Sequence, residues 1–336
     1  MHRNETVRPP SIRFVIPYFG AWPFWMDFFL EGCRRNTDIE WLFFTDCGVP
    51  ERAPDNVTFV EMSFQAYCEL VSERLGISFC PLQPYKLCDI KPALGYIHED
   101  RLADVDFWAF GDIDVIYGDL RQYFTAERLA AKDLFATHAR RISGHLCLLR
   151  NTPLMREAFM CIPNWQKRYA DQAHQALDEG AFSRLFVRHK NWPEKLRLLA
   201  ARFSSWSRRS EFVESHSTFS ILPDGERVVP LRWSLRQGRL TNSELGALEL
   251  PYLHFLVWKN EHWKGRAPDS LRGPEGLAES DSWDVTEAGW QRAAERAHWS
   301  RKRHPSLRWL FLATTMRNMS AKQYVACWHR TTKVLS

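Results

Sequence analysis

The chain has no cysteine pattern that would indicate a disulfide framework or a zinc site. Its 336 residues include eight cysteines, but no two form a CxxC pair and none clusters with histidine. Several lie in strand-like or helix-like apolar patterns, which is typical of reduced, buried thiols in a cytosolic protein. Their positions are 33, 47, 68, 80, 88, 147, 161 and 327.

The apolar runs of an exported or membrane-spanning chain are also missing. The first residues, MHRNETVRPPSIRF, contain no apolar segment of the kind that a signal peptide requires. No run reaches the ~18 to 20 apolar residues of a membrane-spanning helix. We therefore expect a cytoplasmic protein, in which any membrane contact would be peripheral and on the inner face of the plasma membrane.

Several motifs of nucleotide-dependent enzymes and hydrolases are absent. The chain has no GxxxxGK[ST] loop, no GxGxxG and no GxSxG, which argues against P-loop kinases, dinucleotide-dependent enzymes and α/β-hydrolases. Its first apolar strand leads into PYFGAWP, without the glycine-rich, arginine-bearing loop of sugar nucleotidyltransferases. A formal net charge of only +5 gives no indication of a nucleic-acid partner.

What the chain does contain is an alternation of apolar strands and amphipathic helices. This order predicts an α/β fold with a mostly parallel, Rossmann-like sheet flanked by helices. In the last of the early helices, Pro92 is acceptable if it lies in the first turn, with Asp89 as the N-cap. The expected strands are 12–16, 40–46 and 56–64, and the expected helices are 23–36, 64–76 and 84–100.

The rest of the chain carries less regular patterns. Two strand-like pieces lie at 134–138 and 145–149, and a mostly helical segment is expected at 170–189. The remaining segments are a basic amphipathic stretch at 195–210, a late strand running into a basic turn at 249–260, a Gly/Pro/Ser-rich connector at 265–282 and a basic, aromatic tail at 298–318.

The most informative stretch is FWAFGDIDVIYGDL at 107–120, where Asp112 and Asp114 end a strongly apolar run. In an extended segment these two side chains share one face, while Ile113 points into the core. Neighbouring carboxylates repel each other and lose solvation unless a positive group lies between them. Mg²⁺ or Mn²⁺ suits such hard oxygen ligands and would also neutralise a departing diphosphate. A loop cap or a salt-bridged pair is the alternative.

Six segments taken in order carry a resemblance to known sequences: IPYFG, LFFTD, NVTFVEMSF, PYKLCDIKPA, FGDIDVIYGDL and GHLCLLRNTP. The stretch from PYKLCDIKPALGYI to FGDIDVIYGDL resembles the DxD region of GT-A fold glycosyltransferases. The whole set resembles an uncharacterised bacterial family associated with surface-polysaccharide biosynthesis. The resemblance covers about residues 12–190, with a short piece near 252–260.

This resemblance implies a GT-A-like fold and a division of the chain into regions. We expect a catalytic domain over 11–262, with a nucleotide-binding half at about 11–120 and an acceptor half at about 121–262. A linker and a basic, helical C-terminal addition would follow over 263–336.

The resemblance also implies contacts with a nucleotide sugar. Tyr18 would stack on a uracil ring, or else pack as an aromatic residue of the turn. Asp46 would contact the base or the ribose, or cap a helix. The other candidates precede the aspartate pair: Lys86 or Lys91 would face phosphate unless it lies in solvent, and Asp89 would be an acidic contact.

His254 and Lys259 form a partial match to a second motif. Retaining enzymes with the HxxGxxK signature use a late histidine as a third metal ligand and a lysine to bind the diphosphate. YLHFLVWKN lacks the middle glycine and has a shorter spacing. The match favours a retaining reaction and predicts that His254 joins Asp112 and Asp114 on Mn²⁺ or Mg²⁺, unless His254 is an ordinary core histidine.

The acidic segment ALDEGAFSRLF at 176–186 resembles the one that lies beside the donor sugar. Asp178 or Glu179 would bind sugar hydroxyls or the acceptor, or act as the general base of an inverting enzyme. An ordinary acidic helix turn is the alternative. His145, which follows Gly144, is a further candidate for a sugar or acceptor contact.

The two basic stretches at 195–210 and 298–318 mix Arg and Lys with Leu, Phe and Trp. A basic helix with aromatic residues can lie on an anionic leaflet. This would suit an enzyme whose acceptor is lipid-linked. The alternative is that both stretches pack on the catalytic domain and keep their charges in water.

Together these features predict a metal-dependent glycosyltransferase of hexosyltransferase type. It would move a sugar from a nucleotide-diphosphate donor, which we expect to be a UDP-sugar, to a cell-surface glycan such as lipopolysaccharide or to a lipid-linked precursor. Two alternatives stay open. One is a related nucleotide-sugar phosphotransferase or nucleotidyltransferase, and the other is a glycan-binding protein without catalysis.

Overall fold

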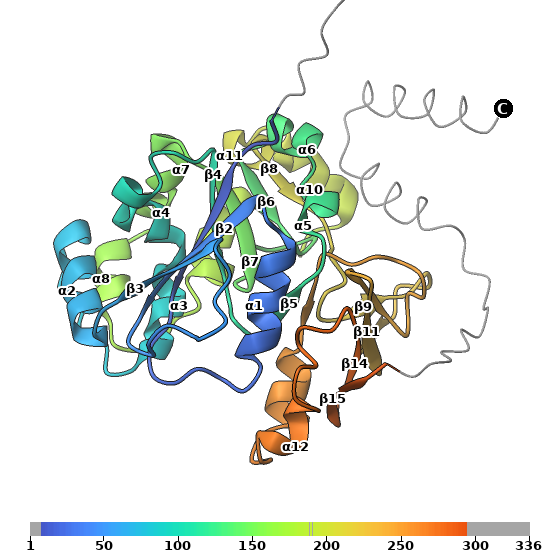
Figure 1. Cartoon of the computed structure of the whole chain (residues 1–336). Coiled ribbons are helices and arrows are strands. Elements are labelled where there is room, and N and C mark those ends of the chain that lie inside the picture. Colours follow the sequence, from blue (N-terminus) through green and yellow to red (C-terminus); the bar gives the residue numbers. More distant parts are fainter. Residues whose placement is uncertain (1–7, 188, 190, 294–336) are drawn as a thin grey trace, which may run out of the picture.

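In the computed structural model the chain folds around one large mixed sheet (Figure 1), and the structure describes residues 8–187, 189 and 191–293. Only β7 runs against its neighbours β4 and β6, while the other adjacent pairs are parallel. The order across the sheet is β3 (Val57–Glu61), β2 (Ile39–Thr45), β1 (Ile12–Pro17), β4 (Phe107–Gly111), β7 (Leu146–Arg150), β6 (Leu134–Ala136) and β8 (Ser210–Phe212).

Both faces of this sheet are buried. Phe14 and Phe107 point into one hydrophobic cluster, whereas the next residues in the chain, Val15 and Trp108, point into the other. This alternation follows from the two-residue period of a strand. Near-continuous apolar runs are typical of parallel strands that are covered on both sides.

Helices supply the two covering layers. The Phe14 face packs against α1 (Met26–Arg35), α5 (Leu120–Tyr123) and α6 (Ala126–Ala131). The Val15 face packs against α2 (Phe64–Leu75), α3 (Leu87–Ile90), α4 (Leu94–Ile97), α7 (Pro153–Arg156), α8 (Trp165–Ala170) and α9 (Ser183–Phe186). The arrangement confirms the predicted α/β fold class, with its mostly parallel sheet flanked by helices.

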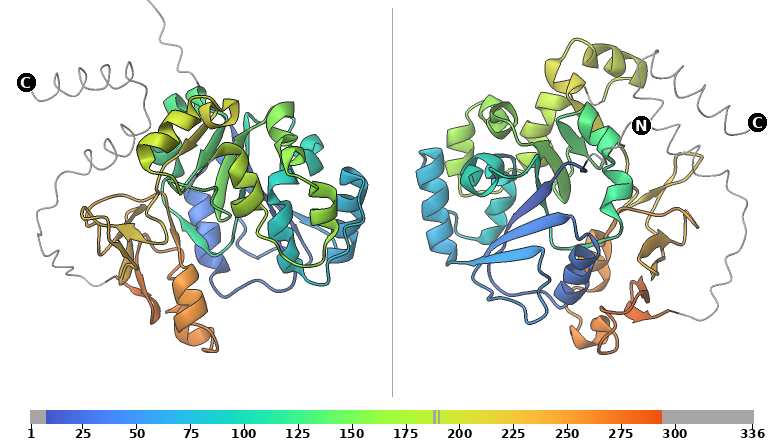
Figure 2. Two further views of the ribbon diagram at one scale, coloured as in Figure 1. Left: turned by 180° about the vertical axis from the view of Figure 1, so that it is seen from behind. Right: turned by 45° about the horizontal axis from the view of Figure 1, so that its top comes forward.

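Smaller sheets extend the Phe14 side of the molecule (Figure 2). β5 (Val115–Tyr117) pairs antiparallel with β13 (Tyr252–His254). A four-stranded antiparallel sheet has the order β12 (Arg239–Asn242), β11 (Arg232–Arg236), β14 (Ser282–Thr286) and β15 (Gly289–Arg292). Its buried tryptophans, Trp233, Trp283 and Trp290, belong to the same cluster as α1. The remaining elements here are β9 (Ser220–Ile221), β10 (Arg227–Val228) and α12 (Asp269–Arg272).

The helix expected over 84–100 is broken into short pieces. Pro92 has no N–H to continue the hydrogen bonding of α3, and a 3-10 turn, η2 (Lys91–Ala93), separates α3 from α4. Two more 3-10 turns flank them, η1 (Pro84–Lys86) and η3 (Glu99–Arg101). The prediction of Asp89 as an N-cap was wrong, because this residue lies inside α3 and its carboxylate accepts from a distant loop.

Two other expectations differ from the structure. The segment 170–189 becomes helical only at a π-helical turn, η5 (Asp178–Phe182), which leads into α9. Part of the region expected to be a linker and a helical addition forms β14 and β15 instead, and β14 pairs with β11. The alternation of Trp283 and Val285 with polar residues carried that strand signal. The predicted basic tail at 298–318 lies outside the described residues.

The basic stretch at 195–210 forms α10 (Glu194–Ala201) and α11 (Ser205–Arg208) before it enters β8. Among the described residues, no helix combines the length and the apolar character that crossing a bilayer would require.

Candidate functional site

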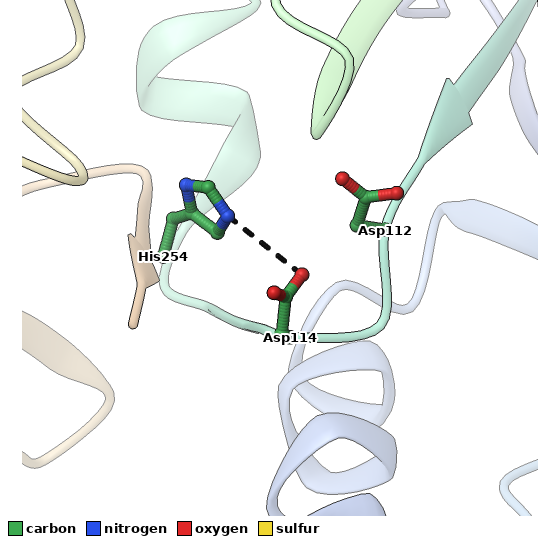
Figure 3. A group of neighbouring side chains, drawn as sticks. All are labelled: Asp112, Asp114 and His254. Atoms are coloured by element: carbon green, nitrogen blue, oxygen red, sulfur yellow. Dashed lines mark ion pairs between the residues drawn. The ribbon is translucent and has the colours of Figure 1, made fainter. Parts of the chain in front are cut away.

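The site is centred on three side chains from two distant parts of the chain. β4 ends at Gly111 and β5 begins at Val115, so Asp112 and Asp114 lie in the short bend between the two strands. Pairing of β13 with β5 sets His254 opposite Val115. One ligand atom from each of the three residues lies within 4.8 Å of the others, and the side chains converge on a common space (Figure 3).

The imidazole of His254 is oriented by a neighbour that the sequence did not indicate. Its Nδ1 lies 2.7 Å from the hydroxyl of Thr218, and its backbone N–H donates to the carbonyl of Ser217. Because Nδ1 is engaged, Nε2 faces the aspartates and lies 3.7 Å from Asp114 Oδ1. A hydrogen bond of this kind on the remote nitrogen is how proteins fix the tautomer and direction of a metal-binding histidine.

Two lysines hold the aspartate pair. Lys91 Nζ donates to Asp112 and to the carbonyl of Gly144, the latter at 2.9 Å. Lys259 Nζ lies 2.5 Å from Asp114 Oδ2. Burial alone would lower the pKa of Lys91, but the charge of Asp112 raises it above its usual value. Burial alone would raise the pKa of Asp114, but His254 and Lys259 bring it well below the ordinary range. Each of the two aspartates therefore has a lysine ammonium of the protein as its counter-charge.

A second pair of acids, Asp178 and Glu179, lies beside Gly144, whose carbonyl accepts from Lys91. Glu179 accepts from the backbone N–H of Gly144 at 3.1 Å and forms an ion pair of 2.6 Å with Arg141. Asp178 is buried, and this burial raises its pKa to about 6 although the charge of Lys91 opposes the shift. A Cβ at position 144 would lie 2.6 Å from Asp178 Oδ2, so any other residue there would require the Asp178 carboxylate to shift.

His145 forms one wall of the site. Its ring stacks on that of His254, with centroids 4.1 Å apart and an interplanar angle of 23°. Burial, followed by the nearby His254, holds the pKa of His145 well below its usual value, so this imidazole is neutral. Its backbone carbonyl accepts from the N–H of Asp112 at 3.3 Å. The predicted sugar contact thus adjoins the metal-ligand candidates directly.

Tyr18 and Asp46 lie on the loops after β1 and β2. The ring of Tyr18 stacks on Trp22, with centroids 5.3 Å apart. Burial raises the pKa of Tyr18 to about 12, and the charge of Asp114 is among those that add to the shift. Asp46 is exposed, and its Oδ1 accepts from the backbone N–H of Gly20 at 2.8 Å. Tyr18 thus lies within electrostatic reach of Asp114, and the contacts of Tyr18 and Asp46 with a nucleotide stay predictions.

Lys86 and Asp89 are engaged in contacts within the protein. Both are buried, with Lys86 Nζ 2.9 Å from Asp89 Oδ2. Asp89 also accepts from the backbone N–H groups on either side of Ala176, each at 2.9 Å, where the chain takes a positive φ of 47°. Such a conformation is costly for alanine and needs support from its surroundings. The pair fixes the turn that leads into Asp178, and Lys86 Nζ also donates to two backbone carbonyls, so both side chains are occupied by contacts within the protein and not by a nucleotide.

The cluster fits a divalent cation. Two carboxylates and an imidazole form a donor set that Mn²⁺ accepts readily and Mg²⁺ less readily. The site and its borders carry four carboxylates and three cationic side chains. A divalent cation would therefore change the formal charge of this group from negative to positive, which suits a diphosphate. The carboxylates are Asp112, Asp114, Asp178 and Glu179, and the cations are Lys91, Lys259 and Arg141.

Two solved structures illustrate what the fold is similar to. The galactosyltransferase LgtC, solved in complex with donor and acceptor sugar analogs, is 14% identical, and the match covers 50% of this chain and 71% of that chain with a TM-score of 0.31. Mouse xyloside xylosyltransferase 1, in its apo form, is 9% identical, with coverage of 61% and 85% and a TM-score of 0.38. The fold class described above rests on the strand order of the sheet.

A search of curated proteins gives no match. The model of a family of unknown function, DUF6625, matches residues 14–266 and thus spans the whole site, from the loop after β1 to Lys259. The chain belongs to the DUF6625 family.

Proposed function

We propose that this protein is a metal-dependent glycosyltransferase that uses a nucleotide-diphosphate sugar, with UDP-sugars as the first class to test. The acceptor would be a cell-surface glycan or its lipid-linked precursor. Two features of the molecule support this function: the GT-A-like arrangement of the sheet and the side chains gathered at the end of β4.

One observation carries the proposal. Asp112, Asp114 and His254 bring their ligand atoms within 4.8 Å of one another at the edge where β4 ends, with a lysine ammonium on each aspartate. In α/β sheets, ligands bind beyond the carboxyl ends of the strands. A cation site flanked by lysines at that edge is suited to a diphosphate leaving group.

The residues of the site would have separate roles in binding the diphosphate, the sugar and the acceptor. A bound Mn²⁺ or Mg²⁺ would supply Lewis-acid stabilisation of the negative charge that develops on the diphosphate. Lys259, and Lys91 once Asp112 is engaged elsewhere, would donate to phosphate oxygens. Asp178 and Glu179 would bind sugar hydroxyls or the acceptor. Tyr18, Asp46 and His145 would line the base and sugar sides of the pocket.

The stereochemical course is part of the proposal. The partial match of His254 and Lys259 to the motif of retaining enzymes favours transfer of a hexosyl group with retention. The anomeric configuration of a product isolated from a UDP-hexose reaction, measured by NMR coupling constants, decides between retention and inversion.

The test of the metal role uses Asp112→Asn and Asp114→Asn, with Asp55→Asn as a control, because Asp55 is exposed and remote from the cluster. We expect each site variant to lose roughly 100-fold or more of its UDP release from UDP-sugars, since losing a metal ligand removes several kcal/mol of transition-state stabilisation. Asp55→Asn should retain full activity.

The same variants should bind Mn²⁺ at least about tenfold more weakly by calorimetry, with melting temperatures close to that of the unmodified chain. Near-normal turnover and Mn²⁺ binding in both Asp112→Asn and Asp114→Asn would refute the metal role. Release of UMP in place of UDP, with the sugar phosphate transferred, would refute glycosyl transfer and indicate a phosphotransferase. Formation of UTP and a sugar 1-phosphate from a UDP-sugar and added pyrophosphate would indicate a nucleotidyltransferase.

A further inference from the structure

A stripe of large apolar side chains lies exposed along α10. Trp192, Leu196, Leu199 and Phe203 are 46%, 50%, 50% and 83% exposed. Leu196 and Leu199, three residues apart, share one side of α10, and Trp192 and Phe203 flank the helix at its two ends. The helix itself has no buried residue. We call these four side chains the α10 stripe. Single exposed apolar residues are ordinary, but four large ones within twelve residues of the chain, on and beside one short helix, indicate an interaction surface.

The charges around the α10 stripe are of one sign. Residues 192–209 contain five Lys or Arg and a single acid, Glu194. Lys195, Arg202 and Arg208 are exposed, and within the described part of the chain none of the three forms an ion pair with an acid. The surface therefore offers large apolar groups at its centre and unpaired positive charge at its margins.

We infer that the α10 stripe docks on an anionic lipid bilayer. An interfacial helix inserts its apolar side at the level of the headgroups, and each nearby Lys or Arg adds about 1 kcal/mol of attraction to an anionic leaflet. Trp192 and Phe203, near the two ends of the stripe, are residue types suited to that depth.

Charge argues against two other occupants. A second copy docking through the same patch would bring two sets of five cations together. The chain's own residues 294–336 carry nine Lys or Arg and one acid, so their charge is not complementary to the stripe. An anionic surface is the partner that both the apolar and the basic side chains fit.

The α10 stripe is connected to the proposed acceptor side of the site. α9 follows directly after η5, which carries Asp178 and Glu179. α11 is bound to α9, because Ser207 Oγ donates to the carbonyl of Phe186 at 2.5 Å and the ring of Trp206 lies 5.2 Å from that of Phe186. The right-hand view of Figure 2 shows the helices of this region protruding at the top of the molecule. Because α10 and α11 precede β8, which runs parallel to β6, they lie at the amino end of these strands, whereas Asp112 and Asp114 follow the carboxyl end of β4. Docking of the α10 stripe therefore does not depend on the transferase activity.

The test compares the full chain with Leu199→Ser/Phe203→Ser and with a control of similar apolar exposure elsewhere, Leu82→Ser/Leu231→Ser, whose residues are 80% and 76% exposed. Flotation uses vesicles of phosphatidylcholine with about 30% phosphatidylglycerol and vesicles of phosphatidylcholine alone. We expect the unmodified chain and the control to float with the anionic vesicles. The stripe variant should show roughly a tenfold or greater loss of its partition coefficient at unchanged Tm.

Binding that is equal on neutral and anionic vesicles would overturn the inference, as would a stripe variant that floats like the unmodified chain. Association through the stripe into dimers, seen by analytical ultracentrifugation and abolished in Leu199→Ser/Phe203→Ser without vesicle binding, would also overturn it. If the stripe variant loses melting temperature, Arg202→Glu repeats the test on an exposed side chain and should lower anionic binding alone.

Discussion

At the residue scale, Asp178 gives the site a measurable pH dependence. Its pKa is raised from 3.8 to about 6, chiefly because the carboxyl is buried. A carboxyl with a higher pKa in the folded than in the unfolded state binds its proton more tightly when folded. Its contribution to stability is therefore present below about pH 4 and is lost as the pH rises through about 6. Above that range the ionised side chain destabilises the fold.

We therefore predict that Asp178→Asn is more stable than the unmodified chain at neutral pH. The difference in the free energy of unfolding should reach roughly 3 kcal/mol at about pH 7.5 and disappear below about pH 4. Urea titrations at several pH values measure it. Glu179→Gln serves as the matched control, because the ion pair of Glu179 with Arg141 is lost in that variant and no gain in stability at neutral pH is expected. A difference for Asp178→Asn that is independent of pH would contradict the assignment.

The residue scale also shows what could be predicted from the sequence. Asp112 and Asp114 were predictable because they are neighbours in the chain and directly follow an apolar strand. Thr218, which orients His254, and Arg141, which pairs with Glu179, carry no such local signal. Their roles arise only when distant loops meet, and a lone Thr or Arg in a sequence is more often an ordinary surface residue.

At the element scale, the short helices before β4 depend on one buried ion pair. Asp89 and Lys86 are 0% and 3% exposed, and Asp89 also binds the turn around Ala176. Removing one partner of such a pair leaves a charge buried without compensation. We predict that Asp89→Ala lowers the free energy of unfolding by roughly 3 to 5 kcal/mol.

Asp100→Ala is the matched control, because Asp100 pairs with Arg74 at 3.2 Å on the surface. That change should cost less than about 1 kcal/mol. Urea unfolding followed by tryptophan fluorescence compares the two variants. Equal losses of stability would show that the Asp89 pair is not the buried support that its contacts indicate.

Element boundaries were predictable where the apolar period was regular and not where the backbone was special. The strands β1, β2 and β4 and the helix α2 with its cap at Gly76 lie where their patterns placed them. Segment 170–177 does not, because Ala176 takes a left-handed conformation that Asp89 supports from a distant position in the chain. Helical spacing alone carries no information on such a contact.

At the scale of the whole molecule, the site is assembled from segments that span most of the described chain. Lys91 comes from η2, the aspartates from the bend after β4, and Lys259 from a π-helical turn, η6 (Trp258–His262), after β13. Their charges balance in the absence of a ligand, because Lys91 and Lys259 each hold one aspartate. A cation that binds the aspartates must displace these ammonium groups, and the displaced ammonium groups then need an anion.

Metal and diphosphate should therefore stabilise the fold cooperatively. We predict that Mn²⁺ alone or UDP alone raises the Tm only slightly, and that both together raise it by more than the sum of the separate shifts. A ligand stabilises the fold by RT ln(1 + [L]/Kd), and each of these ligands should lower the Kd of the other. In Lys259→Met the shift with Mn²⁺ alone should increase and the shift with UDP alone should decrease. In Asp114→Asn the cooperative part should vanish. Additive shifts in the unmodified chain would show that the lysines do not couple the two ligands, since a cation that leaves both ion pairs in place creates no new demand for an anion.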